Sequence, residues 1–190
     1  MKPFILKPDG SVVQQDESPH PGGDIRADDV HVPHLEPHVE TFALDQTDEV
    51  KILIRYSCHC WSCGYEDRLH AGQLRFLDGS RARAFDPYRH DASIHLSGLM
   101  RNLPHNRIYV TRSERNYGAY CSTLMDAAGH RYTAFFTLRP RKGKFDGIRH
   151  KLLLVVESAY GRAQPEPGMK TNFRAVIAKA REGEMVKYRR

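Results

Sequence analysis

The segment SCHCWSCGY, residues 57–65, holds three of the four cysteines of the chain, together with a histidine and the only tryptophan. Thiolates and imidazoles bind Zn²⁺ strongly, and a structural zinc site needs four such ligands close together. The C-x-C-x-x-C spacing therefore indicates a zinc site as one interpretation. Its candidate ligands are Cys58, Cys60 and Cys63, with a fourth from Cys121, His59 or His70.

Two other interpretations of the cysteines stay open. Zinc signatures usually contain two separated pairs of ligands, whereas this chain has one cluster and Cys121 lies in an apolar strand segment. Free cysteines are often small buried hydrophobes, and a reactive or redox thiol is the third alternative. At a strand end, His59 and Trp61 would share the face opposite the thiols, where imidazole and indole suit contact with nucleic acid.

A second set of polar residues follows the apolar run LLLVV in the segment ESAYGR, residues 157–162. Cleavage of RNA without a metal needs a general base, a general acid and cations that stabilise the phosphate. A polar loop after a strand is the alternative. The candidate catalytic residues are His59, Glu157, Ser158, Tyr160 and Arg162.

Charge is distributed unevenly along the chain. Residues 1–49 hold eleven acidic against three basic residues, a net charge of −8, and residues 50–190 hold 26 basic against 12 acidic residues, a net charge of +14. Nineteen of those 26 are arginine, whose planar guanidinium suits bidentate contact with phosphate. The basic part predicts a nucleic-acid partner, RNA rather than DNA, and a merely solvating surface is the alternative.

The candidate nucleic-acid contacts lie in two basic segments. They are Arg112, Arg115 and Tyr117 in the first and Arg139, Arg141, Lys142 and Lys144 in the second. The acidic segment 1–49, or an acidic protein partner, would compete with nucleic acid for this basic surface.

The elements that position these residues divide at the same boundary. Residues 14–40 contain four prolines and a Gly-Gly pair, which exclude a helix or a central strand. We therefore predict an irregular acidic arm at 1–49, in which the histidines of HVPHLEPH (31–38) are solvated, followed by a basic domain at 50–190.

The sequence pattern of the basic domain predicts an α+β fold, in which an antiparallel sheet of about five strands has a helix packed on one face. VKILIRYS (50–57) predicts a strand, and the turn signal Asp78-Gly79-Ser80 predicts a hairpin of residues 73–85. A helical stripe consists of Leu96, Leu99, Met100 and Leu103, with Asp91 as its N-cap. The further strand segments are 107–112, 119–126, 131–138, 151–158 and 173–179, with connections short enough to require antiparallel pairing.

A helix followed by such a meander, together with ESAYGR, resembles the barnase/RelE/colicin-type ribonuclease superfamily of bacterial and phage toxins. The resemblance covers residues 90–179 as topology. It implies phosphodiester cleavage by acid–base residues on the sheet. The residues that would take these roles are a histidine and Glu157, Ser158, Tyr160 and Arg162. The resemblance also implies control by an acidic partner or segment.

Two functions follow as predictions. The first is a metal-independent endoribonuclease-like toxin domain that needs no cofactor. The alternative is a non-catalytic module that binds nucleic acid or protein, stabilised by zinc, such as a phage inhibitor of a host system.

No apolar run approaches the roughly 20 residues of a membrane-spanning helix, and Pro8 interrupts the short apolar N-terminal piece. We therefore expect no membrane segment and a cytoplasmic protein with reduced cysteines.

Overall fold

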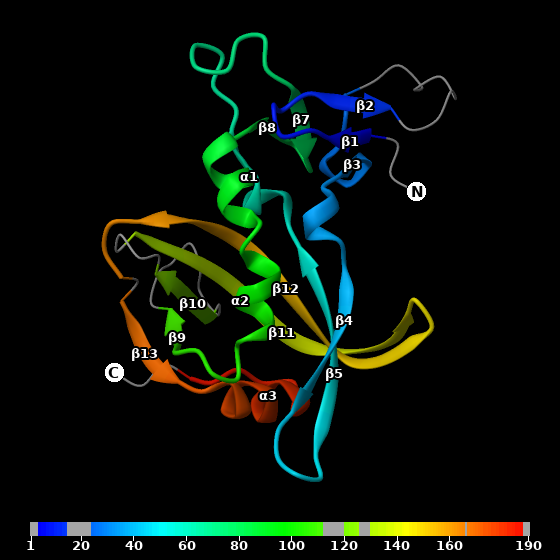
Figure 1. The fold of residues 1–190 in the computed structure, drawn as a ribbon, viewed down its shortest axis with the longest axis vertical. Coiled ribbons are helices and arrows are strands. Elements are labelled where there is room, and N and C mark those ends of the chain that lie inside the picture. The colour runs from blue at the N-terminus through cyan, green and yellow to red at the C-terminus, as the bar shows by residue number, and fades with distance from the viewer. Residues whose placement is uncertain (1–3, 15–23, 112–119, 126–129, 166, 188–190) are drawn as a thin grey trace.

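The computed structural model describes residues 4–14, 24–111, 120–125, 130–165 and 167–187. Within these ranges the chain forms an α+β fold dominated by strands, with a central sheet of the order β13-β9-β10-β11-β12-β5-β4 (Figure 1). These strands are β4 (His38–Ala43), β5 (Glu49–Tyr56), β9 (Ile108–Thr111), β10 (Tyr120–Met125), β11 (Arg131–Phe145), β12 (Ile148–Arg162) and β13 (Gly168–Thr171). The predicted α+β class is confirmed, but the described sheet has seven strands rather than about five.

Strand pairing follows the lengths of the connections. The pairs β9–β10, β10–β11 and β11–β12 are antiparallel, as the short connections predicted. By contrast, β5 and β12 pair in parallel, because the long connection between them permits a crossover. Ile52, Leu53 and Ile54 of β5 are all buried, as expected for a strand that is covered on both faces.

The described helices are α1 (Pro87–Ser93), α2 (Leu96–Arg101) and α3 (Phe173–Arg181). The predicted stripe is confirmed as buried, with Leu96, Leu99 and Met100 in α2 and Leu103 in the turn that follows it. Asp91 is not the N-cap of this helix: α2 follows His95, whose side chain makes no capping hydrogen bond, and Asp86 caps α1 by accepting from the Arg89 amide. Side chains of α2, α3 and the central sheet share one hydrophobic core.

Helix α3 replaces the strand predicted at 173–179. Asn172 caps it by accepting from the Ala175 amide, and its buried residues recur with a helical period. They are Phe173, Val176, Ile177 and Ala180. The prediction of a strand was wrong because it depended on the apolar residues of the segment, whereas the spacing of these residues is that of a helix.

Two smaller sheets lie beside the central one. The predicted hairpin is confirmed as β7 (Arg75–Asp78) and β8 (Arg81–Phe85), joined at Gly79, which has a φ of 60°. Strand β6 (Ser62–Gly64) pairs with β8. The other sheet contains β1 (Phe4–Leu6), β2 (Val12–Gln14) and β3 (Val30–His31) in the order β2-β1-β3 (Figure 1).

The acidic N-terminal segment is not irregular throughout. Strand β4 pairs antiparallel with β5, and its Phe42 is buried against the ring of Phe173 in α3, with centroids 4.9 Å apart. Two short 3-10 helices, η1 (Ala27–Asp29) and η2 (Pro33–Leu35), and strand β3 precede it. The prolines interrupt the chain before β4, and residues 38–49 are free of them. No helix in the described parts of the chain is long and apolar enough to cross a bilayer.

Candidate functional site

The segment that holds the cysteine cluster turns sharply where β5 ends. Ser57 caps a 3-10 helix, η3 (Cys58–Cys60), by accepting from the His59 amide at 3.2 Å, and its hydroxyl donates to the Glu157 carbonyl at 2.5 Å. Cys58 and Cys60 therefore do not share the face of an extended strand, as had been predicted. The helical turn instead buries the thiol of Cys60 and leaves the side chains of Cys58 and His59 partly exposed.

His59 pairs with a carboxylate from the β7–β8 hairpin. Its Nε2 lies 2.8 Å from Oδ2 of Asp78, and the two side chains are 34% and 39% exposed. The sequence identified Asp78 only as a turn residue, since a turn signal does not reveal which side chain lies opposite the turn. The pairing brings a titratable imidazole and an acid together across two sheets.

Cys58 completes a cluster of three chemically useful side chains. Single ligand atoms of Cys58, His59 and Asp78 all lie within 4.8 Å of one another. Burial disfavours the thiolate and raises the pKa of Cys58 to about 12. A thiol with so high a pKa is a poor nucleophile at neutral pH, which argues against a redox or nucleophilic role for it without a metal.

The other three cysteines are held apart from this cluster. Cys60 is fully buried and its Sγ lies 3.6 Å from the Val156 carbonyl. Cys63 Sγ lies 3.4 Å from Nε2 of His70, and Cys121 is buried in β10. Among the described residues, the predicted set of Cys58, Cys60, Cys63 and Cys121 does not meet at one point, and all four are free of disulfides.

Trp61 does not stand beside His59 on an open face. Its side chain is only 4% exposed and stacks on Phe76, with ring centroids 4.7 Å apart. The turn at η3 carries the indole into the core, so the expected base-stacking surface is not formed by this residue.

The segment ESAYGR continues strand β12 rather than leaving the sheet. The register with β11 shifts opposite Glu157, and pairing then continues to Arg162. Glu157 is exposed and accepts from the Thr137 hydroxyl at 2.8 Å, while the ring of Tyr160 stacks on Phe135 at 5.4 Å. Ser158 is partly buried, opposite Phe135 in the register.

Arg89 of α1 links the two candidate segments and was not identified from the sequence. Its guanidinium donates to the His59 carbonyl at 3.2 Å and lies 5.1 Å from the ring centroid of Tyr160. It also pairs with Asp86 at 3.3 Å. Arg162 approaches the same ring at 5.9 Å. The structure therefore brings Tyr160 and Arg162 together, whereas His59 joins them only through its main-chain carbonyl, which accepts from Arg89.

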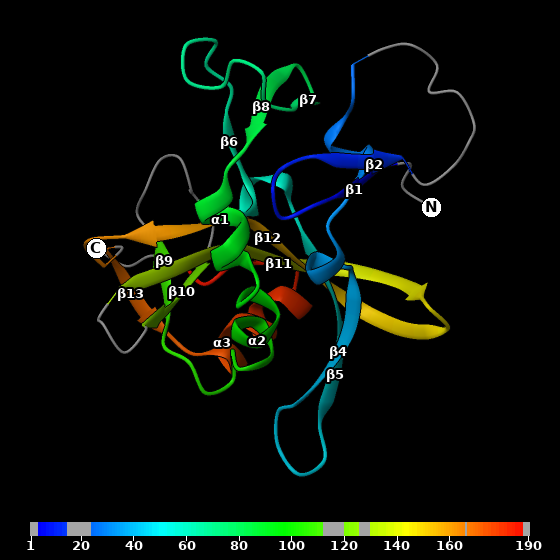
Figure 2. The ribbon, with the colours of Figure 1, turned by 45° about the horizontal axis from the view of Figure 1, so that its top comes forward.

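A basic hairpin is formed by residues 139–151, at the distal ends of β11 and β12. Figures 1 and 2 show this hairpin projecting from the sheet. Asp146 and Gly147 have φ angles of 45° and 79°, which is the conformation of a type I′ turn. Its exposed basic side chains are Arg139, Arg141, Lys142, Lys144, Arg149 and Lys151. The predicted contacts Arg112, Arg115 and Tyr117 lie outside the described residues.

The acidic N-terminal segment pairs with cations other than those of the hairpin. Its ion pairs join Asp24 to Arg75 at 3.1 Å, Glu40 to Arg101 at 3.0 Å and Asp48 to Arg181 at 2.8 Å. None of the six basic hairpin residues forms an ion pair with another described residue. Lys151 does act on the acidic segment, since it helps to lower the pKa of Asp48, and the charge of the other five is available to a partner.

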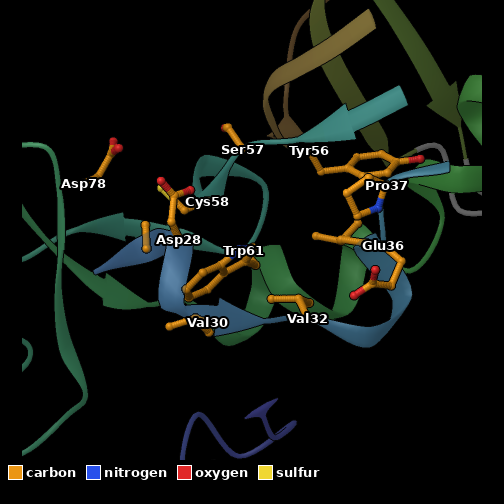
Figure 3. A pocket seen from close by; sticks show the side chains of 12 residues that line it. Asp28, Val30, Val32, Glu36, Pro37, Tyr56, Ser57, Cys58, Trp61 and Asp78 are labelled. Atoms are coloured by element: carbon orange, nitrogen blue, oxygen red, sulfur yellow. The ribbon is translucent and has the colours of Figure 1, made fainter. Parts of the chain in front are cut away.

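A small cavity of about 140 Å³ adjoins two members of the cluster, Cys58 and Asp78 (Figure 3). Cys58 and Asp78 line it, together with Trp61 and with Asp28 of η1. It is bounded by segments that are far apart in the sequence, and for this reason sequence patterns did not indicate it.

The fold and the site together define an α+β protein with a histidine–carboxylate–thiol cluster at the end of a central strand. The chain belongs to the YjaZ family, whose family model matches residues 24–181. It is 26% identical over 161 residues to Protein YjaZ of Escherichia coli (strain K12), which covers 81% of this chain and 83% of that protein. No solved structure matches the chain.

Family membership corrects the resemblance to the barnase/RelE/colicin-type ribonucleases. The matched region begins at residue 24, inside the acidic segment, and so includes β4 and the small sheets as well as the meander. The resemblance depended on a meander of about five strands and on ESAYGR as a strand end. The meander is present as β9-β10-β11-β12, but it is part of a seven-stranded sheet, and ESAYGR continues β12 instead of ending it.

Proposed function

We propose that the protein binds nucleic acid through the basic hairpin, residues 139–151, without cleaving it. The observation that supports the proposal is the density of exposed charge: six basic side chains and a single acid, Asp146, on a projecting two-stranded ribbon. Lysine and arginine contacts to phosphate dominate the affinity of proteins for nucleic acid. The partner expected from the sequence is RNA, and we expect the protein to act in the cytoplasm.

The shape of the hairpin also suits a polyanion. A two-stranded β-ribbon fits the major groove of B-form DNA, whereas double-stranded RNA offers its phosphates and a wide, shallow minor groove. Exposed cations on both strands would reach phosphates of either duplex. The relative affinity for RNA and DNA therefore becomes part of the test.

Binding without cleavage is favoured by the contacts of the predicted catalytic residues. Glu157 accepts from Thr137, and His59 is bonded to Asp78. Each of these two candidate acid–base groups is therefore already engaged with another side chain of the protein. A general acid and a general base need to reach the same phosphodiester.

The test measures binding of a structured RNA hairpin and a DNA duplex by fluorescence anisotropy at several salt concentrations. The variant Arg141→Gln, Lys142→Gln, Lys144→Gln removes three charges from the hairpin. We expect weaker binding and a log–log salt slope that is smaller by about 1 for each lost phosphate contact. Intact RNA after incubation with EDTA is the second expected result.

The matched control is Arg68→Gln, Arg81→Gln, Lys170→Gln, which removes three exposed charges outside the hairpin. Net charge changes equally in the two variants, so only a specific hairpin contact distinguishes them. An equal loss of affinity in both would contradict the assignment to the hairpin. RNA cleavage that disappears in Glu157→Gln or His59→Gln would support the ribonuclease function instead.

A further inference from the structure

We propose that Cys58, His59 and Asp78 bind one Zn²⁺ ion, with a fourth coordination position open to the adjoining cavity. The proposal is independent of nucleic-acid binding, because the cluster lies at the end of β5 and the basic residues lie on the β11–β12 hairpin. It also differs from a four-cysteine site, since two of its ligands are an imidazole and a carboxylate.

The ligand atoms are close enough to share an ion after small movements. They lie within 4.8 Å of one another, and Nε2 of His59 is 2.8 Å from Oδ2 of Asp78. In a tetrahedral zinc site, bonds of about 2.0–2.2 Å place a nitrogen and an oxygen ligand about 3.4 Å apart. An ion would therefore replace the hydrogen bond between these two groups and separate them by about half an ångström.

The surrounding backbone is arranged to hold the two consecutive ligands in place. The cap from Ser57 fixes the turn, and the hydroxyl of Ser62 donates to the Cys58 carbonyl at 2.6 Å. Arg83 in turn donates from Nε to the Ser62 hydroxyl at 2.8 Å and from Nη2 to the Ser62 carbonyl at 2.9 Å. Outer hydrogen bonds of this kind orient metal ligands.

The chemistry of the ligands selects the type of ion. A thiolate disfavours Mg²⁺ and Ca²⁺, which prefer oxygen ligands, and suits Zn²⁺. The ligand set offers one thiolate and one carboxylate, whose two negative charges balance the ion. With three protein ligands, the fourth position would face the cavity of about 140 Å³ that Cys58 and Asp78 line. Sites with three protein ligands keep a place for water or a substrate.

The experiment uses the full chain, freed of metal with a chelator and titrated with Zn²⁺ against a chromophoric competitor. Titration with Co²⁺ reports the ligands, since a thiolate ligand produces an intense charge-transfer band in the near ultraviolet. We expect one ion per chain and a thiolate band. Cys58→Ser should abolish the band and weaken zinc binding by at least about 100-fold, because even outer-shell changes cost 10–100-fold.

Two further variants keep the result interpretable. Asp78→Asn preserves the shape of the side chain and should weaken zinc binding with little change in the unfolding midpoint. The control Cys63→Ser removes a thiol that lies beside His70 and should leave binding unchanged. Absence of micromolar zinc binding, or binding that survives Cys58→Ser and is lost in Cys63→Ser, would overturn the proposed site.

Discussion

The imidazole of His150 lies directly over the backbone of Gly143, so that a Cβ added at Gly143 would be 2.9 Å from Nε2. His150 is 5% exposed, and its Nδ1 lies 3.0 Å from the Arg141 carbonyl. The register of the hairpin shifts between Pro140 and Gly143, opposite this histidine. One glycine and one buried ring therefore fix the bulge of the basic hairpin.

We predict that Gly143→Ala lowers the free energy of unfolding by about 1–3 kcal/mol, because the fixed ring cannot yield without losing its hydrogen bond. Denaturant unfolding measures the effect. Gly98→Ala is the matched control: Gly98 is exposed in α2 with nothing near its Cβ position, so alanine there should stabilise by about 0.5–1 kcal/mol. Equal effects of the two changes would contradict the packing of His150 on Gly143.

Stability should fall as the pH drops through the range in which His34 would gain a proton. Burial, followed by the nearby His90, lowers the pKa of His34 below its ordinary value, while Asp91 acts weakly in the opposite direction. The unfolded chain, in which the imidazole has an ordinary pKa of about 6.5, then binds the proton more readily than the folded protein. The stabilisation is therefore present above about pH 6.5 and is lost progressively below it.

The variant His34→Gln checks this effect in denaturant unfolding between about pH 7 and pH 5. The ring of His34 lies 4.9 Å from that of His90, and its Nε2 is 2.6 Å from the Ser93 hydroxyl. Glutamine can keep a polar contact with Ser93 but cannot titrate. The dependence of stability on pH should become shallower in the variant, and an unchanged dependence would show that other groups cause it.

Arg89 should be coupled energetically to Tyr160. A guanidinium over an aromatic ring contributes about 0.5–1 kcal/mol at a partly exposed site. Glutamine at this position removes the positive charge and the planar fork that also bonds the His59 carbonyl. We expect a double-mutant cycle of Arg89→Gln and Tyr160→Leu to give a coupling of about 0.5–1 kcal/mol in the free energy of unfolding. Strict additivity would mean that the stacked geometry contributes nothing.

Local patterns predicted the elements whose signals are contained in a few consecutive residues. The α2 stripe from Leu96 to Leu103 and the turn at Asp78-Gly79-Ser80 both appear in the structure. Helix α3 was within reach of the same method, because Phe173, Val176, Ile177 and Ala180 follow the helical period. The Asp146-Gly147 turn was also readable, since Asp-Gly favours a type I′ hairpin.

The candidate site could not be predicted in the same way. His59 and Asp78 meet only because η3 turns the chain and the β7–β8 hairpin folds toward it. Arg89 reaches Tyr160 from a helix that is distant in sequence. Contacts of this kind depend on tertiary packing, and neither residue type nor spacing encodes them. Cys60 and Trp61 are conspicuous in the sequence because cysteine and tryptophan are rare residue types. Both side chains are buried, since rare residue types also fill cores.

The four cysteines should react with iodoacetamide in an order set by burial and by pKa. Burial raises the pKa of Cys63, raises that of Cys58 to about 12, and raises that of Cys60 as well. The thiolate is the reactive form, so at pH 8 all three should react more slowly than a free cysteine. Cys63 should react first, since its pKa has no comparably large rise and it is partly exposed.

Mass spectrometry of peptides after timed alkylation gives the rate at each residue. We expect Cys58 to follow Cys63, and Cys60 and Cys121 to react only in denaturant, because they are 0% and 1% exposed. Raising the pH should speed the reaction of Cys63 before that of Cys58, since the thiol with the smaller rise in pKa ionises first. Rapid labelling of Cys60 in the native protein would contradict the burial of η3 against β12, on which the placement of His59 depends.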